Sequence, residues 1–219
     1  HSENELIARS IQNPDLCQIA VQAVVDLLDL EQSDGTYITD QFTAEEIWGA
    51  IFEMVKLSTG KQDPYRKEKL AARQTAYLLI HQFQDQDLDW IERLKLVIAG
   101  NLIDYSNTRV VNNLSHNPRY FEESLLVALS SDFSINCFSQ FQEYVIEASP
   151  KRLVWLIDND GESIFDMWFI EQLAELEHQV VVVGKQEPAS NDTTLADLHE
   201  ISRSPEFQKL RDQMRYGHV

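Results

Sequence analysis

The sequence predicts an α/β protein in which a helical N-terminal part is followed by a Rossmann-like three-layer α/β/α part with a mostly parallel sheet. Three observations support this fold class. Apolar residues recur at helical spacing up to residue 148, and beyond it apolar runs alternate with helical stretches. Only 7 Gly and 6 Pro argue against a loop-rich all-β fold. We expect a helical bundle region at residues 1–148 and an α/β region at 149–219.

The N-terminal part is predicted to consist of amphipathic helices. Asn13-Pro14-Asp15 begins the first helical stretch, and Ser33-Asp34-Gly35 ends it. Thr43 and Glu46 have the spacing of a capping box, and the helix that they begin should end at Gly60. Further helices are expected over residues 67–84, 89–99, 121–129 and 138–146, and later in the chain over 192–201 and 205–214.

Two apolar runs in the α/β region each lead into a polar cluster. Leu153–Ile157 precedes Asp158-Asn159-Asp160-Gly161-Glu162, and Val180–Val183 precedes Asn191-Asp192-Thr193-Thr194. We expect two strands, joined by a crossover helix over residues 163–177 and therefore parallel. Parallel strands end at one edge of the sheet, so Asp158, Asn159 and Asp192 should converge there. Carboxylate and amide oxygens are the ligands of a hard divalent metal.

The first acidic cluster has other interpretations. It could simply cap the crossover helix, since negative charge is favourable at a helix N-terminus. A calcium loop is excluded, because Leu156 and Met167 would occupy ligand positions. Asp158 could also be the nucleophile of an aspartyl phosphatase. The second cluster favours a metal site, because like charges on neighbouring strands are unfavourable without a cation.

Composition limits the partners. There are 18 Lys and Arg against 36 Asp and Glu, a net charge of −18, and such a surface repels nucleic acid and anionic membranes. Cys17 and Cys137 lack metal-site spacing and are expected to be reduced thiols of a cytoplasmic protein. No apolar run reaches transmembrane length. The oligomeric state is not indicated.

Four segments in this order carry a family resemblance. They are Thr-Gly-x-x-Asp-Pro-Tyr at 59–65, Ala-Gly-Asn-x-x-Asp at 99–104, Asp-Asn-x-Gly-Glu at 158–162 with Asp166, and Pro-x-x-Asn-Asp-x-Thr at 188–194. With them the chain resembles the metal-dependent damage-control phosphatases, the domain-of-unknown-function 89 family. The resemblance implies a divalent ion (manganese, nickel, cobalt or magnesium) and hydrolysis of phosphate esters of small metabolites such as sugar phosphates.

The resemblance also implies roles for individual residues. Asp158, Asn159 and Asp192 would be the metal ligands. Asn101 and Asp104 would lie on the substrate side, and Glu162 would bind a substrate hydroxyl.

The remaining catalytic groups are less constrained. Asp104 or Asp160 could be the general base, and the sequence does not choose between them. The N–H groups at the start of the helix at Ser163 would face the phosphate.

Relatives depart from this sequence in one respect that bears on function. They usually continue into a lysine-containing segment that holds the phosphate, whereas this sequence ends at Val219, and Lys185 and Arg203 are the nearest replacements. The alternative expectation is therefore a catalytically inactive metal- or ligand-binding relative, or a fragment.

Overall fold

The structure is a computed structural model that describes residues 14–210 and 215–218. Its contacts divide the chain into two compact units, His1–Arg66 and Lys67–Val219, here unit 1 and unit 2. This division differs from the one expected at residue 148. The reason is that α5 (Trp90–Gly100) packs closely on α9 (Glu162–Glu175), so the later helices of the N-terminal part share a core with the α/β part.

Unit 1 is a helical hairpin of α2 (Pro14–Leu28) and α3 (Ala44–Thr59), connected through a short 3-10 turn, η1 (Ile38–Asp40). The capping box is confirmed, because the Thr43 hydroxyl accepts from Glu46 N at 3.3 Å and the Glu46 carboxylate accepts from Thr43 N at 2.8 Å. Gly60 ends α3 with a φ of 66°, so the predicted end of this helix is confirmed.

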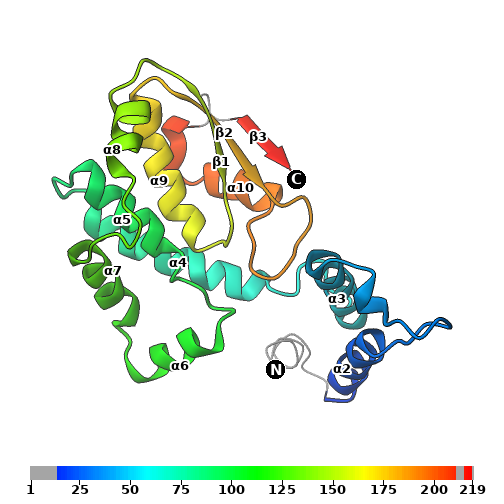
Figure 1. Ribbon diagram of the computed structural model, residues 1–219. Coiled ribbons are helices and arrows are strands. Elements are labelled where there is room, and N and C mark those ends of the chain that lie inside the picture. The colour runs from blue at the N-terminus through cyan, green and yellow to red at the C-terminus, as the bar shows by residue number, and fades with distance from the viewer. Residues whose placement is uncertain (1–13, 211–214, 219) are drawn as a thin grey trace. The chain divides into compact units, whose positions relative to one another are not determined.

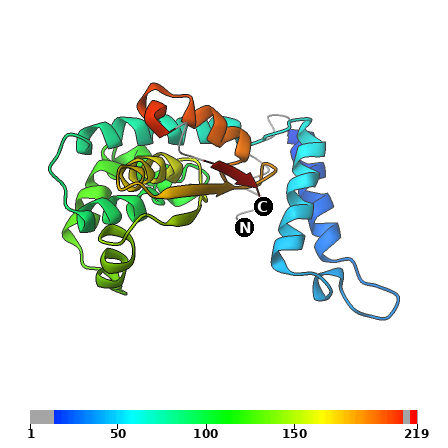
Figure 2. The same cartoon turned by 90° about the horizontal axis from the view of Figure 1, so that it is seen from above.

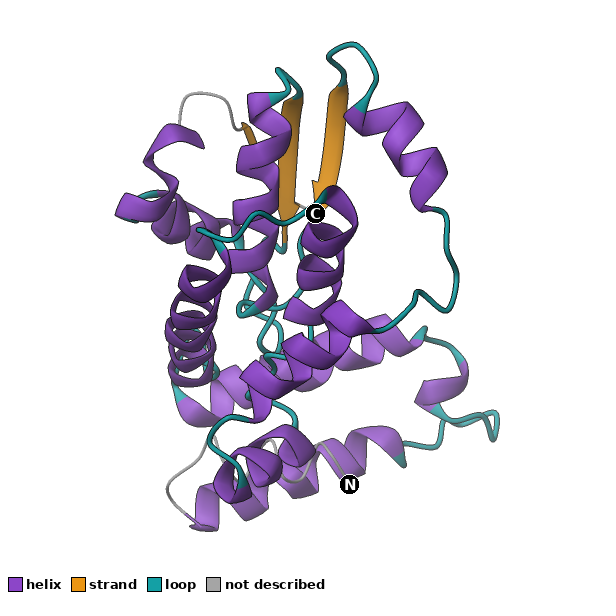
Figure 3. Ribbon diagram, turned by 90° about the vertical axis from the view of Figure 1, so that its left-hand side faces the viewer, coloured by secondary structure: helices purple, strands orange, loops and turns teal. Residues whose placement is uncertain are grey.

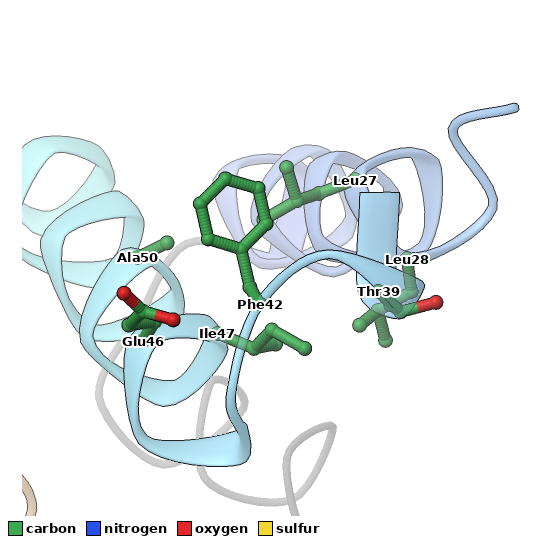
Figure 4. Close-up of a pocket in the computed structure, with 7 residues that line it drawn as sticks. All are labelled: Leu27, Leu28, Thr39, Phe42, Glu46, Ile47 and Ala50. Atoms are coloured by element: carbon green, nitrogen blue, oxygen red, sulfur yellow. The ribbon is translucent and has the colours of Figure 1, made fainter. Parts of the chain in front are cut away.

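A mainly apolar pocket of about 210 Å³ lies between α2, η1 and α3 (Figure 4). Its one carboxylate, that of Glu46, already accepts the capping bond from Thr43. The pocket therefore offers no set of polar groups suited to catalysis. It is lined by Leu27, Leu28, Thr39, Phe42, Glu46, Ile47 and Ala50.

Unit 2 begins with helices that precede the α/β part, and α5 among them packs on α9 (Figure 1). The expected helices at 67–84, 89–99 and 121–129 are present, and the one expected at 138–146 is a short α-helix that continues as a π-helix. A helix at Thr108–His116 was not predicted. The elements are α4 (Arg66–Phe83), α5, α6 (Thr108–His116), α7 (Tyr120–Ser130), α8 (Phe138–Phe141) and η2 (Gln142–Ile146).

The sheet of unit 2 has the order β1-β2-β3 and is parallel throughout (Figure 3). It consists of β1 (Arg152–Leu156), β2 (Gln179–Gly184) and β3 (Arg215–His218). The parallel β1–β2 pair, joined through α9, is confirmed. β3 was not predicted. The helix expected at 205–214 is a 3-10 helix, η3 (Pro205–Leu210), and residues 211–214 lie outside the described part.

Helices cover one face of this sheet. Val180 and Val182 share the main core with buried residues of α9 and with Leu198 of α10 (Leu195–Ser202), and Figure 2 shows the strands edge-on with α10 on one side. On the opposite face, Val154 and Leu156 are 65% and 72% exposed. The polar loops that follow β1 and β2 are thus held on a sheet anchored to α9 and α10.

Two further findings concern membrane-spanning helices and cysteines. None of the helices in the described part of the chain combines the length and apolar composition that crossing a bilayer requires. Cys137 is an exposed free thiol, while the side chain of Cys17 lies outside the described residues.

Candidate active site

The two polar clusters meet at the carboxyl edge of the sheet. We call residues 157–161 loop 1 and residues 185–194 loop 2. Thr193 N donates to Asp158 O at 2.7 Å, and Asp160 N donates to Asn191 O at 3.0 Å. Asn159 and Asp192 form an antiparallel bridge. The backbone thus brings the expected metal ligands Asp158, Asn159 and Asp192 close to one another.

Asn159 organises the start of α9. Its side-chain oxygen accepts from Glu162 N at 3.0 Å, and its amide nitrogen donates to Asn101 at 3.0 Å and to the Glu162 carboxylate at 3.2 Å. Asn101 and Glu162 therefore lie beside the expected ligands. Ser163 N donates to the Asn159 carbonyl at 3.1 Å. The N–H groups of Glu162 and Ser163, the first two of α9, are thus both bonded to Asn159. They are therefore not free to face a phosphate, as the sequence had suggested.

Asp104 is attached to loop 2. Its Oδ1 accepts from the Asn191 amide at 2.8 Å, from Ser106 N at 2.9 Å and from the Ser106 hydroxyl at 2.6 Å. Asn191 directly precedes Asp192. Asp104 follows α5 and is far from loop 2 in the sequence. Its bond to Asn191 nevertheless fixes it next to the loop that carries Asp192.

The site concentrates negative charge around the exposed Asp158. Burial, followed by the charge of Asp158, raises the pKa of Glu162 to about 7 and that of Asp192 to about 6. Lys185 Nζ opposes the shift at Asp192 from 3.6 Å. Burial and the neighbouring Glu162 raise the pKa of Asp166 well above its usual value, although Trp155 donates to Asp166 at 2.9 Å. Such a group of carboxylates favours a bound cation.

The donor chemistry fits a divalent metal. No three His, Cys, Asp or Glu side chains among the described residues are arranged as a metal-binding group. The expected ligands include only two carboxylates, Asp158 and Asp192, with the Asn159 amide as the third donor. All three are oxygen donors, as hard divalent ions prefer. The Asn159 oxygen accepts one hydrogen bond and keeps a second lone pair.

Asp160, the other candidate general base, is occupied by contacts inside the protein. Its side chain is completely buried, and Arg73 of α4 donates from Nε to Oδ2 at 2.6 Å and from Nη2 to Oδ1 at 2.9 Å. Both oxygens accept from the guanidinium and are buried, which makes Asp104 the better placed of the two candidates. Asp104 remains the candidate base.

The sequence reasoning missed the cations of α4. Arg73 also donates to Asp197 at 2.7 Å and to Glu200 at 2.9 Å, and Lys69 forms an ion pair with Asp197. Lys69 is 0% and Arg73 is 6% exposed. The sequence contains a signal for these buried cations. Lys69 and Arg73 are one helical turn apart and lie on the same helix face as the apolar Ala72. Cations on a buried face require buried anions elsewhere in the chain.

Comparisons with known proteins identify the family of this chain. The family model of the damage-control phosphatase ARMT1-like domain matches residues 17–216. An uncharacterised protein of Methanocaldococcus jannaschii is 27% identical over 166 residues, 73% of this chain and 52% of its own length. Damage-control phosphatase PH1575 of Pyrococcus horikoshii is 31% identical over 144 residues, 64% of this chain and 46% of its own length. The chain spans about half the length of these curated relatives.

A solved structure supports the fold. The crystal structure of a DUF89 family protein, PH1575 from Pyrococcus horikoshii, matches with a TM-score of 0.72 and 24% identity, covering 98% of this chain and 68% of that one. The family model extends over nearly the whole chain, and the four sequence segments lie within it. The chain therefore belongs to the damage-control phosphatase ARMT1-like domain family.

Proposed function

We propose that this protein is a divalent-metal-dependent phosphatase that hydrolyses phosphate esters of small metabolites such as sugar phosphates. The observation that carries the proposal is the meeting of Asp158, Asn159 and Asp192 at one sheet edge, with the backbones of their loops hydrogen-bonded to each other. Relatives named damage-control phosphatases support the reaction class.

Asp158, Asn159 and Asp192 would hold the ion, and manganese, nickel, cobalt and magnesium all suit oxygen donors. A divalent ion bound there supplies Lewis-acid polarisation of phosphate oxygens. Lys185 adds a positive charge 3.6 Å from Asp192, which would attract a phosphate to the acidic site.

The substrate side of the site is polar. Asp104 is the group that would take a proton from the attacking water, since Asn191 and Ser106 hold its carboxylate in place. Asn101 is exposed, and Glu162 is partly buried next to Asn159. In this proposal both would contact hydroxyl groups of a substrate such as a sugar phosphate.

The test is a metal-by-substrate screen. Protein stripped with a chelator receives magnesium, manganese, cobalt or nickel and is assayed with sugar phosphates and an aryl phosphate. Asp158→Ala and Asp192→Ala should each lose calorimetric metal binding and fall to background hydrolysis. Asp132→Ala, which removes an exposed carboxylate of the α7–α8 loop, should behave as wild type.

The outcomes separate the possible functions. Unchanged turnover in both ligand variants would overturn the proposal. Metal binding without turnover of any phosphate ester would identify an inactive metal-binding relative. A trapped phosphoaspartate at Asp158 would instead indicate an aspartyl-nucleophile phosphatase.

A further inference from the structure

The cations of α4 connect loop 1 to the beginning of α10. Asp160 belongs to loop 1 and lies two residues from Asp158. Asp197 belongs to the first turn of α10, which follows loop 2. Arg73 is hydrogen-bonded to both carboxylates, and one nitrogen, Nη2, donates to Asp160 at 2.9 Å and to Asp197 at 2.7 Å. The spacing of these two anions is therefore set by a single planar group.

Asp197 is in turn bonded to loop 2 through Thr194. It accepts from Thr194 N at 3.0 Å and from the Thr194 hydroxyl at 2.6 Å, which completes the capping box of α10. Thr194 lies two residues from Asp192. Lys69 forms an ion pair with the same oxygen of Asp197, so the carboxylate that fixes the end of loop 2 is itself held by α4.

Arginine is needed for this arrangement, because its guanidinium forms the paired bonds of Nε and Nη2 to Asp160 and extends Nη1 to Glu200. Lysine would keep the charge but could not reproduce the fork. Without a bridging cation, Asp160 and Asp197 would be two buried like charges, and their repulsion would separate loop 1 from α10.

We propose that Arg73 is a positioning residue that fixes loop 1 against loop 2 and thereby sets the affinity of the site for its divalent ion. This inference rests on the proposed function. Displacement of Asp160 would move the adjacent Asn159 and break the bond from Asp160 N to Asn191 O, one of the two backbone bonds that join the loops. Residues that hold metal ligands in place typically change metal affinity by about 10–100-fold when they are replaced.

The test compares metal affinity with folding stability. Arg73→Lys should weaken Mn²⁺ binding by about 10–100-fold in calorimetry, measured on protein that circular dichroism shows to be folded. The matched control is Arg93→Lys. Arg93 is a partly buried arginine of α5 that lies over the Trp90 ring and bonds to Gln172, distant in sequence from both loops. Arg93→Lys should lower the urea midpoint without changing Mn²⁺ affinity.

A second variant addresses the possibility that Arg73→Lys does not fold. The double variant Arg73→Met/Asp160→Asn removes the cation together with its main anion, so no unpaired buried charge remains at that pair. This double variant should fold. Its Mn²⁺ affinity should nevertheless be lower than that of wild type, because no side chain then bridges loop 1 to Asp197.

The results distinguish this inference from the proposed function. Wild-type protein that binds none of the four ions would overturn both. If wild type binds Mn²⁺ and Asp192→Ala does not, the metal site stands. Mn²⁺ affinity within about threefold of wild type in the folded Arg73 variants would then overturn the positioning role alone, and only a structural role for Arg73 would remain.

Discussion

Asp197→Asn should destabilise unit 2 in a pH-dependent manner. Asn has nearly the same shape as Asp and can still cap a helix, so the substitution mainly removes the charge that Lys69 and Arg73 share. Asp197 is 2% exposed, so solvent does little to replace that charge. The effect should therefore report on the buried ion pairs rather than on the helix cap.

The magnitude follows from the pKa of Asp197. Burial alone would raise this pKa, but the charge and hydrogen bond of Lys69, followed by the bonds from Thr194, lower it from 3.8 to about 2. One pKa unit is equivalent to about 1.4 kcal/mol, so the charged form contributes about 2–3 kcal/mol at neutral pH. Removing one partner of a buried ion pair costs about 3–5 kcal/mol, because its partner stays buried. The expected loss is therefore about 2–5 kcal/mol.

The sign of the pH dependence follows from the direction of the shift. Because the folded pKa lies below the unfolded value of 3.8, the stabilisation is fully present above about pH 5 and is lost as the pH falls toward 2. The difference in unfolding free energy between wild type and Asp197→Asn should be constant from pH 7 to pH 5 and should shrink below pH 4.

Urea denaturation in a Trp48→Phe background measures this difference for unit 2. Trp48 is the tryptophan of unit 1, so the three that remain of the 4 in the chain, Trp90, Trp155 and Trp168, all report on unit 2. Asp132→Asn, at an exposed site, is the control and should change stability by less than about 0.5 kcal/mol. A loss below about 0.5 kcal/mol in Asp197→Asn at pH 7 would refute the reasoning. A loss that is the same at pH 6 and pH 2.5 would show that the cap, not the charge, is responsible.

Three further predictions concern other contacts. Gly161→Ala should destabilise unit 2 by about 1–3 kcal/mol in urea denaturation, because the added Cβ would lie 2.4 Å from Ile103 O; an unchanged midpoint would contradict this. Lys185→Met should tighten Mn²⁺ binding, since it removes a cation 3.6 Å from Asp192, and should raise the KM for phosphate esters; weaker Mn²⁺ binding would contradict it. Thr43→Ala should destabilise unit 1 by about 0.5–2 kcal/mol, seen as faster hydrogen exchange in the first turn of α3 with unchanged metal affinity. Slower exchange there would show that the capping box is not stabilising.

Elements whose structure depends on residues close to one another in the sequence could be predicted. β1, α9 and β2 follow from apolar runs and helical spacing, and the parallel β1–β2 pair follows from their connection by one helix. The capping box at Thr43 is equally local. β3, by contrast, is a four-residue segment, Arg-Tyr-Gly-His, without a strand pattern. Its strand conformation depends on pairing with β2, which no local signal announces.

The orientation of consecutive carboxylates could not be predicted from loop 1 itself. Asp158 and Asp160 stand two residues apart in an acidic cluster, and both are chemically suited to a metal or a proton. The structure leaves Asp158 exposed and buries Asp160 completely. The partner that decides this, Arg73, lies 87 residues away, so the choice belongs to tertiary packing.

The acidic residues at this edge therefore form two groups with opposite electrostatic environments. Asp160 and Asp197 lie inside and are neutralised by Arg73 and Lys69. Asp158 is exposed, and Glu162 and Asp192 are partly buried near it, so that burial and then the Asp158 charge raise the pKa of both. If Lys69 and Arg73 instead lay beside the outer carboxylates, they would neutralise them, and the attraction for a divalent ion would fall. Keeping Lys69 and Arg73 buried on α4 stabilises the loops while leaving the outer negative charge to a metal.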